Sequence, residues 1–321
     1  MRTRHLFLAI GLAAVWGFNF VVMEAGLRHF PPLFYVALRF TLAAFPALLF
    51  VGGPRVPWRW VLAAGATLGV TQYGLLLLGM RAGMPAGLTS LVVQVQAVFT
   101  VILAVVLLGE RVTARRITGM AVAFAGLAMV ALDLGGGGPI GALVLVIGAA
   151  LGWGAGNIAV RKASPPDSLR FMVWLSAVAA VPMMALSLLA EGVPRLEFST
   201  EGTLSVLYVA LVSTLGGFGV WGFLLKRYDA SVVAPYSLLV PIFGMSSAAL
   251  FDGEPVSPLK LAAAALILSG VLYSSTRPRG TAHAVPAPPR PRRWTVPRVP
   301  VSLTSARVSG PQEEAPAGER L

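Results

Sequence analysis

The chain has 321 residues, of which 56% are hydrophobic and only 12% are charged. An ordinary soluble domain carries about 25% charged residues, so this composition excludes a soluble globular protein. The formal net charge of +12 would suit nucleic-acid binding, but the basic residues lie in turns and in the C-terminal segment, so we expect no nucleic-acid partner. Three scattered histidines and no cysteine leave no candidate metal site, disulfide or cysteine nucleophile, and we expect no cofactor.

Ten apolar runs follow one another along the chain. A helix of about 20 residues is long enough to cross the ~30 Å hydrocarbon core of a bilayer. The runs lie roughly at 5–25, 33–52, 60–80, 85–108, 115–134, 139–160, 170–190, 203–224, 231–252 and 258–276. The first run has a basic start, like a signal peptide, but no clear small-residue cleavage site, so we expect it to remain as a helix. The sequence therefore predicts an all-α integral membrane protein with ten transmembrane helices.

The basic residues predict how these helices are oriented. If the N-terminus is cytoplasmic and the helices alternate, twelve arginines and lysines fall in inward turns and four in outward turns. This excess satisfies the positive-inside rule, which the reversed orientation violates. The inward residues are Arg2, Arg4, Arg55, Arg59, Arg111, Arg115, Arg116, Arg161, Lys162, Arg170, Lys226 and Arg227, and the outward ones are Arg28, Arg81, Arg195 and Lys260. We expect both termini in the cytoplasm.

Segments 86–126 and 230–270 repeat one pattern at a fixed offset of 144 residues. Each is a long apolar run, a glycine followed by Glu110 or Glu254, a short polar turn and a second apolar run. Each half of the chain then holds five helices, and because five is odd the second half crosses the membrane in the opposite sense. Such inverted repeats are typical of transporters. Convergent apolar helices without a common origin are the alternative explanation.

The composition changes after the tenth run, where proline, arginine, alanine, serine and glycine dominate. A segment of this kind cannot bury enough apolar area to fold alone. Its basic residues could contact anionic lipid, or the segment could simply be solvated. We therefore expect a first repeat at 1–136, a second repeat at 137–276 and a disordered, basic, proline-rich cytoplasmic tail at 277–321.

Polar side chains at membrane depth are functional candidates, because burying them away from water is costly. Trp16 and Asn19 in the first helix are matched by Trp153 and Asn157 in the sixth. One interpretation is a wall of tryptophan and asparagine on each side of a central substrate cavity. The other is hydrogen bonding between helices, with neighbouring glycines permitting close contact.

Three glutamines and a tyrosine extend the list of candidates. Gln72 and Tyr73 lie in the third helix, and Gln94 and Gln96 in the fourth. Two residues advance a helix by about 200°, so Gln94 and Gln96 point to nearly opposite sides. Ser90 lies one turn before Gln94 on the same face, so we expect Gln94 to face the cavity and Gln96 to bond between helices.

Two prolines interrupt the ninth helix. Pro235 and Pro241 each remove a backbone hydrogen bond, which frees the carbonyls of Ser231 and Ser237. In a bilayer such groups are tolerated only against protein or a watery cavity. Tyr236 and Ser237 are therefore candidates for a binding site or a gate, although proline kinks also occur in membrane helices without a functional role.

Arg39 is the only formal charge well inside an apolar run. Its side chain could extend toward the outer surface and keep its charge in water. Alternatively it could pair with a carboxylate, either of Glu24 or of a substrate.

Segments 15–22, 83–92 and 233–241 resemble the EamA branch of the drug/metabolite transporter superfamily, as does the turn at 109–111. The resemblance covers roughly 5–275. It implies ten helices in two inverted halves around a central cavity. It also implies export of small amino-acid-like metabolites, of the O-acetylserine and cysteine type, across the bacterial cytoplasmic (inner) membrane by a monomer or homodimer embedded in lipid.

Two other functions compete with metabolite export. An exporter of drugs or lipophilic cations would favour a buried acid beside aromatic rings, and here only Glu24 lies near a run, at its end. An integral-membrane enzyme would need a catalytic constellation near the membrane surface, and the clustered acids Glu191, Glu197 and Glu201 have no such partner in sequence. The choice between proton coupling and facilitated export stays open.

Overall fold

The computed structural model describes residues 1–45, 47–134, 139–194 and 199–275. Within these ranges every regular element is helical. The described residues belong to one compact unit. The predicted disordered tail lies outside the described residues.

The helices follow one another with short turns between them. They are α1 (Thr3–Leu27), α2 (Pro32–Ala44), α3 (Leu48–Val51), α4 (Trp58–Ala64), η1 (Gly65–Gln72), α5 (Tyr73–Arg81), α6 (Ala86–Val92), η2 (Val93–Val95), α7 (Gln96–Leu108), α8 (Ala114–Asp133), α9 (Ile140–Ala163), α10 (Ser168–Ala190), α11 (Thr200–Leu207), η3 (Tyr208–Gly216), α12 (Gly217–Leu225), α13 (Ala230–Val233), η4 (Ala234–Leu239), α14 (Val240–Phe251) and α15 (Pro258–Ser275). Of these, η1 and η3 are π-helical, and η2 and η4 are 3₁₀-helical.

Joined end to end, these elements give eight helices that are long and apolar enough to cross a membrane, from Thr3–Leu27 to Thr200–Leu225. Two shorter apolar helices follow, at Pro235–Phe251 and Pro258–Ser274. The protein is therefore an all-helical, multi-pass membrane protein. Whether all ten helices span the bilayer stays a prediction.

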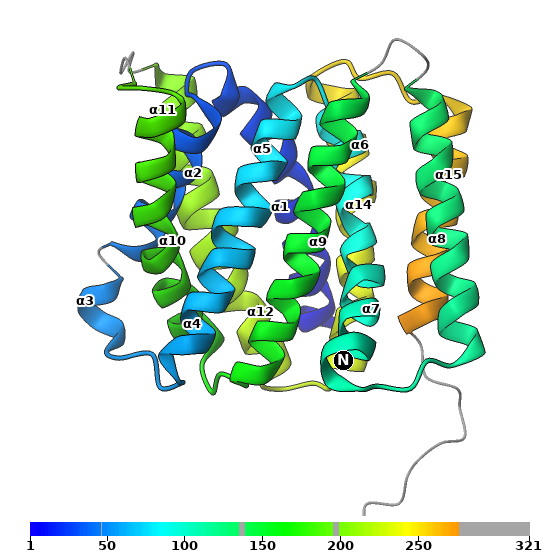
Figure 1. The fold of residues 1–321 in the computed structure, drawn as a ribbon, viewed down its shortest axis with the longest axis horizontal. Helices are drawn as coiled ribbons and strands as arrows, with labels where there is room; N and C mark the ends of the chain where they lie inside the picture. Colours follow the sequence, from blue (N-terminus) through cyan, green and yellow to red (C-terminus); the bar gives the residue numbers. More distant parts are fainter. Residues whose placement is uncertain (46, 135–138, 195–198, 276–321) are drawn as a thin grey trace, which may run out of the picture. The chain divides into compact units, whose positions relative to one another are not determined.

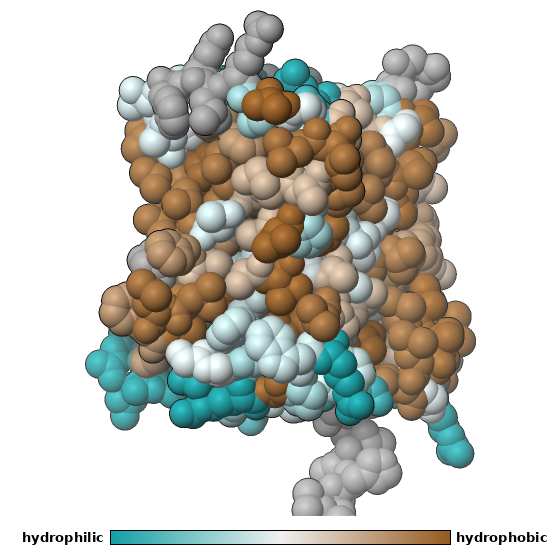
Figure 2. Space-filling view, turned by 60° about the vertical axis from the view of Figure 1, so that its left-hand side comes forward, coloured by the Kyte–Doolittle hydropathy of each residue, from teal (hydrophilic) through white to brown (hydrophobic). Residues whose placement is uncertain are grey.

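The long helices pack side by side, and consecutive ones run in opposite directions (Figure 1). We call the end of the bundle at which α1 begins the near end, and the opposite end the far end. Exposed apolar side chains cover the sides of the bundle, and hydrophilic residues gather along the near end (Figure 2). This is the distribution expected of a bundle whose sides face lipid.

Helices α8 and α15 form a close pair at one edge of the bundle (Figure 1). A Cβ atom on Gly119 would lie 2.6 Å from the carbonyl oxygen of Gly270, and one on Gly126 would lie 2.9 Å from that of Ala263. The offset of 144 residues maps Gly119 onto Ala263 and Gly126 onto Gly270. The contact between Gly119 and Gly270 therefore corresponds to the contact between Ala263 and Gly126. Two repeats related by a two-fold axis would produce such a pair of equivalent contacts.

Several apolar runs are not uniform α-helices. The second run breaks at Phe45, which adopts an extended backbone, the conformation favoured for a residue that precedes a proline. The third and eighth runs each contain a π-helical segment, and the fourth and ninth each contain a 3₁₀-helical one. These interruptions matter because π-helical turns are frequent at functional sites.

Candidate functional site

Arg39 lies in the middle of α2 and is only 2% exposed. Tyr35 and Ala43, one helical turn away on either side, are both fully buried, so Arg39 lies on the face of α2 that packs against the bundle. Its side chain therefore stays inside the protein and does not extend into water, so the structure contradicts that interpretation.

Two side chains from other helices hold the guanidinium group. The carbon Cζ of Arg39 lies 3.7 Å from the ring centroid of Tyr73, and Nε donates a hydrogen bond of 3.1 Å to Oγ1 of Thr214. A cation over an aromatic face is attracted by the negative face of the ring. Tyr73 is itself packed edge-on against Phe40 at 5.6 Å between centroids.

Both of these contact residues of Arg39, Tyr73 and Thr214, lie in or next to a π-helical segment. Tyr73 follows the last residue of η1, and Thr214 lies within η3. The hydroxyl of Thr214 also donates to the carbonyl of Val209, five residues earlier, at 2.7 Å, and Val209 itself is fully buried. Because a π-turn inserts one extra residue, it changes the direction in which the following side chains point.

Asn19 and Met23 of α1 complete the cluster. The sulfur of Met23 accepts contacts from Nδ2 of Asn19 at 3.5 Å and from Nη1 of Arg39 at 3.9 Å, so it links the two polar side chains. Asn19 is 5% exposed, and its Oδ1 has no hydrogen-bond partner. A buried carbonyl oxygen without a donor is costly, so it marks a position where a donor would bind favourably.

The cluster thus combines an unpaired cation with an unpaired acceptor. Among the described residues, Arg39 forms no ion pair, and Glu24 instead accepts a hydrogen bond from the backbone of Ala86. A buried charge is normally paired, because desolvation penalises it strongly. A ligand with a carboxylate and an ammonium group would supply both missing partners, the first to Arg39 and the second to Asn19.

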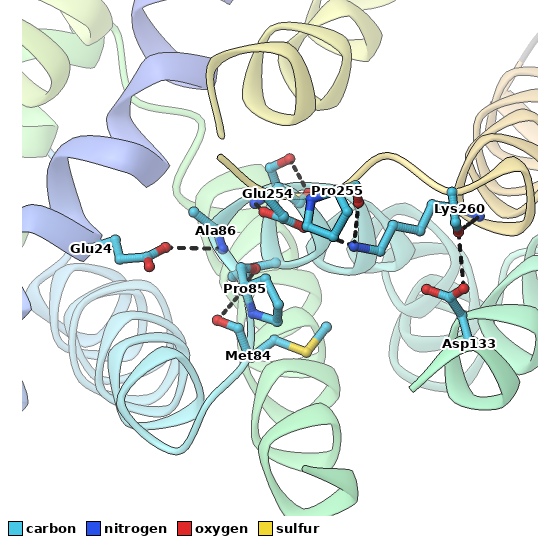
Figure 3. A network of polar contacts seen from close by, with 12 residues as sticks. Glu24, Met84, Pro85, Ala86, Asp133, Glu254, Pro255 and Lys260 are labelled. Carbon is cyan, nitrogen blue, oxygen red and sulfur yellow. Dashed lines mark hydrogen bonds and ion pairs between the residues drawn. The ribbon is translucent and has the colours of Figure 1, made fainter. Parts of the chain in front are cut away.

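A network of polar contacts that includes Glu24 and Glu254 lies at the far end of the bundle (Figure 3). Glu24 of α1 accepts from the backbone N–H of Ala86 at 3.2 Å, and Glu254 accepts from that of Gly87 at 2.8 Å. Both carboxylates therefore lie against the first turn of α6, where negative charge is favoured by the helix dipole. Lys260 lies 3.4 Å from Glu254, and these two side chains are 10% and 13% exposed.

Arg28 and Asp252 add an ion pair of 3.1 Å at the same end. Burial raises the pKa of the Asp252 carboxyl, and the neighbouring Arg28 partly offsets that shift. The Oδ2 atom of Asp252 is buried without a hydrogen-bond partner, which agrees with a carboxylate that is poorly solvated.

The equivalent turn at the near end is more open. Glu110 bonds to Arg116 at 3.2 Å and to Arg161 at 2.5 Å, and the side chains of Glu110 and Arg116 are 25% and 36% exposed. The offset of 144 maps this Glu110–Arg116 pair onto Glu254–Lys260. Equivalent ion pairs thus occur at both ends of the bundle, and the pair at the far end is more deeply buried.

The comparison with known proteins agrees with this architecture. The model of the EamA-like transporter family matches the chain twice, over residues 3–132 and 140–276. The chain belongs to the EamA-like transporter family. A "Probable amino-acid metabolite efflux pump" of Salmonella typhimurium is 41% identical over 84% of this chain and 94% of that relative, and its Escherichia coli namesake is 38% identical over 82% and 92%. A solved crystal structure, 19% identical, has the same fold with a TM-score of 0.60 over 86% of this chain and 98% of its own.

In this EamA-like transporter, three of the predicted site residues meet in the Arg39 cluster, namely Arg39, Tyr73 and Asn19. Gln72 is 4% exposed and ends η1, next to Tyr73. Sequence reasoning did not find Thr214 or Met23. Neither carries a distinctive signal, because single threonines and methionines are common in membrane helices.

Two other predicted residues bond between helices. Gln94, which was expected to face the cavity, donates to the carbonyl of Ser237 at 3.3 Å. Pro241 removes the α-helical partner of this carbonyl, which also accepts from the backbone N–H of Val240. Gln96 accepts from Nδ2 of Asn157 at 2.8 Å.

The contacts described for four further aromatic and polar candidates are with residues other than Arg39. The indole of Trp16 donates to the carbonyl of Ser213 at 3.0 Å and packs against Trp221 at 5.6 Å. Trp153 is partly buried against the main core. Tyr236 packs against a small cluster that includes Leu224. Asn157 also donates to the hydroxyl of Thr100 at 3.0 Å, as the hydrogen-bonding interpretation expects.

Proposed function

We propose that this protein is a secondary transporter that exports small amino-acid-like metabolites, of the O-acetylserine and cysteine type, across the bacterial cytoplasmic membrane by alternating access. The observation that carries this proposal is the buried, unpaired guanidinium of Arg39, held by Tyr73 and Thr214. The family membership and the efflux pumps to which the chain is similar support it independently.

Substrate binding follows from the chemistry of the cluster. A planar guanidinium can hold a carboxylate with two parallel, charge-assisted hydrogen bonds. Nε of Arg39 already donates to Thr214 and Nη1 contacts the sulfur of Met23, so a carboxylate would bind through the remaining N–H groups of the two terminal nitrogens. The free Oδ1 of Asn19 would accept from the ammonium group, so the site would favour zwitterions.

Two inverted five-helix repeats, 1–136 and 137–276, supply the framework for this transport. The exchanged contacts between α8 and α15 and the recurrence of the Glu110–Arg116 pair as Glu254–Lys260 support this arrangement. We place the near end in the cytoplasm, with the N-terminus, on the positive-inside rule. The deeper burial at the far end supports a state that is closed toward the outside.

Export of lipophilic cations is the competing function. A buried arginine in the site opposes it, because a second cation would be repelled at short distance in a medium of low dielectric constant. An enzymatic function has no support from the described residues, among which we find no catalytic constellation around the Arg39 cluster.

Uptake into inside-out membrane vesicles tests the proposal. Vesicles that contain the protein should accumulate radiolabelled O-acetylserine or cysteine faster than vesicles without it. Repeating the measurement with and without a proton gradient determines the energy source. Accumulation of a lipophilic cation, without accumulation of any amino acid, would overturn the proposal in favour of the competing function.

A further inference from the structure

A pocket of about 800 Å³ opens at the near end, beside the turn that connects α3 to α4. The turn from Gly52 to Pro57 forms most of its wall, and Phe50, Trp58 and Arg170, the last in the first turn of α10, also line this open depression. It lies outside the Arg39 cluster, and the proposed substrate site does not include it.

Two guanidinium groups and no acidic residue line this pocket; the nearby Asp167 accepts from the backbone N–H of Arg170 at 3.2 Å. Among the described residues, neither Arg55 nor Arg170 forms an ion pair. Nη1 of Arg170 donates a weak hydrogen bond of 3.4 Å to the carbonyl of Gly53, and its Nε is buried without any partner. An anion in the pocket would therefore gain two cations and one free buried donor.

The surroundings are apolar and aromatic. Phe50 is 83% exposed, and the half-exposed Trp58 packs edge-on against Trp174 at 5.1 Å between centroids. The indole N–H of Trp174 donates to the carbonyl of Gly52 at 2.7 Å. Tryptophan collects at the level of lipid headgroups, because its ring is apolar and its N–H is polar. The pocket thus combines a basic interior with an apolar flank at headgroup depth.

We propose that this pocket binds the phosphate headgroup of an anionic glycerophospholipid. Arg55 and Arg170 hold the phosphate, and the acyl chains lie against Phe50 and its exposed neighbour Leu49. Basic pockets between membrane helices on the cytoplasmic side bind anionic headgroups in this manner. A soluble anion would satisfy the two arginines but would leave the apolar flank unused.

Such a lipid has a structural consequence. Arg55 lies in the first half of the chain and Arg170 in the second, so one phosphate would join the two halves at the near end. The lipid should therefore stabilise the folded bundle as well as bind to it.

Lipid retention by the purified protein tests this site. We compare the parent with the double variant Arg55→Gln, Arg170→Gln, and with a control, Arg111→Gln, Lys162→Gln, that removes two exposed near-end charges outside the pocket. Native mass spectrometry measures the binding of phosphatidylglycerol relative to phosphatidylcholine with the same acyl chains. We expect the parent and the control to prefer phosphatidylglycerol. In the double variant, the ratio of phosphatidylglycerol to phosphatidylcholine binding should be about tenfold smaller.

Thermal unfolding adds a second readout. Phosphatidylglycerol should raise the unfolding temperature of the parent and the control but not of the double variant, while all three unfold alike in phosphatidylcholine. A double variant that keeps the full preference overturns the proposal. So does displacement of the lipid by millimolar glycerol phosphate, which would identify a site for soluble anions. Because neither measurement involves transport, the result is independent of the exported substrate.

Discussion

Arg39 combines deep burial with the lack of a carboxylate partner among the described residues, and in the proposed site its charge would bind the substrate carboxylate. The face of Tyr73 and the hydroxyl of Thr214 reduce the cost of burying the charge, but neither neutralises it. The site without a ligand is therefore less favourable electrostatically than the site that holds a carboxylate. A transport site needs such a difference in order to recognise its substrate.

Arg39→Gln should lower the initial rate of carboxylate transport by about 10- to 100-fold, because a hydrogen bond to a charged group is worth about 1.5–3 kcal/mol. Arg39→Lys should recover the rate only in part, since lysine is a point charge and cannot form the two parallel bonds. Uptake per folded molecule in inside-out vesicles measures the effect, with Arg111→Gln as the control for loss of an exposed arginine. A parent-like rate for Arg39→Gln would remove Arg39 from the site.

Glu110 provides a pH-dependent contribution to stability. The hydrogen bond from Arg161, helped by Arg116, lowers the pKa of the Glu110 carboxyl below its ordinary value of 4.5. The ionised form is thus favoured in the folded protein, so its contribution is fully present above that value and is lost as the pH falls through the lowered pKa.

Glu110→Gln should therefore lower the unfolding temperature at about pH 7 and lower it less at about pH 3, where the pH has fallen below the ordinary pKa of the carboxyl. Thermal unfolding in detergent at both pH values measures the difference between the variant and the parent. An equal difference at both values would show that the charge of Glu110 contributes nothing.

The charge inside an apolar run was enough to single out Arg39 from the sequence, and the hydropathy pattern identified Asn19 and Tyr73 in the same way. The sequence does not show that these three side chains meet, since they come from three different helices. Thr214 was missed because its direction depends on a π-helical turn, for which the residues of η3 give no recognised pattern.

At the level of the elements, the Gly-Glu turns behave as their chemistry predicts. Gly109 and Gly253 have φ angles of 67° and 66°, in the left-handed region that glycine adopts without strain. The ten apolar runs match the helical stretches closely. The π-helical and 3₁₀-helical interruptions were not predicted, because hydropathy reports burial and not the number of residues per turn.

Gly270→Ala should disrupt the pairing of α8 with α15. The added Cβ would lie 2.6 Å from the backbone nitrogen of Ala123 and 2.6 Å from the carbonyl oxygen of Gly119, and backbone atoms cannot move aside cheaply. We expect a lower yield of monodisperse protein in size-exclusion chromatography. Gly141→Ala is the matched control, because its Cβ would meet no atom within 4 Å. Equal yields for both variants would show that this close contact is not required.

For the molecule as a whole, orientation is the property that most needs a test. The chain has no cysteine, so single cysteines can be introduced without removing any. Val193 is 87% exposed in a far-end turn, and Lys162 is exposed at the near end.

An impermeant thiol reagent should label Val193→Cys in intact cells and should leave Lys162→Cys unlabelled until the membrane is opened. This result follows from the excess of basic residues at the near end, which retains that end in the cytoplasm. Labelling of Lys162→Cys alone in intact cells would reverse the orientation, and labelling of both would contradict the ten-helix topology.

The contacts between α8 and α15 also bear on how such a chain could arise. A half-length protein that carried one such helix would make the same Gly–Gly and Gly–Ala contacts with a second copy inserted the other way up. Fusing the two copies fixes one orientation for each, and Arg115 then needs no basic counterpart at Leu259. Once joined, the halves are free to diverge, so a residue such as Arg39 can be present in one half without a counterpart in the other.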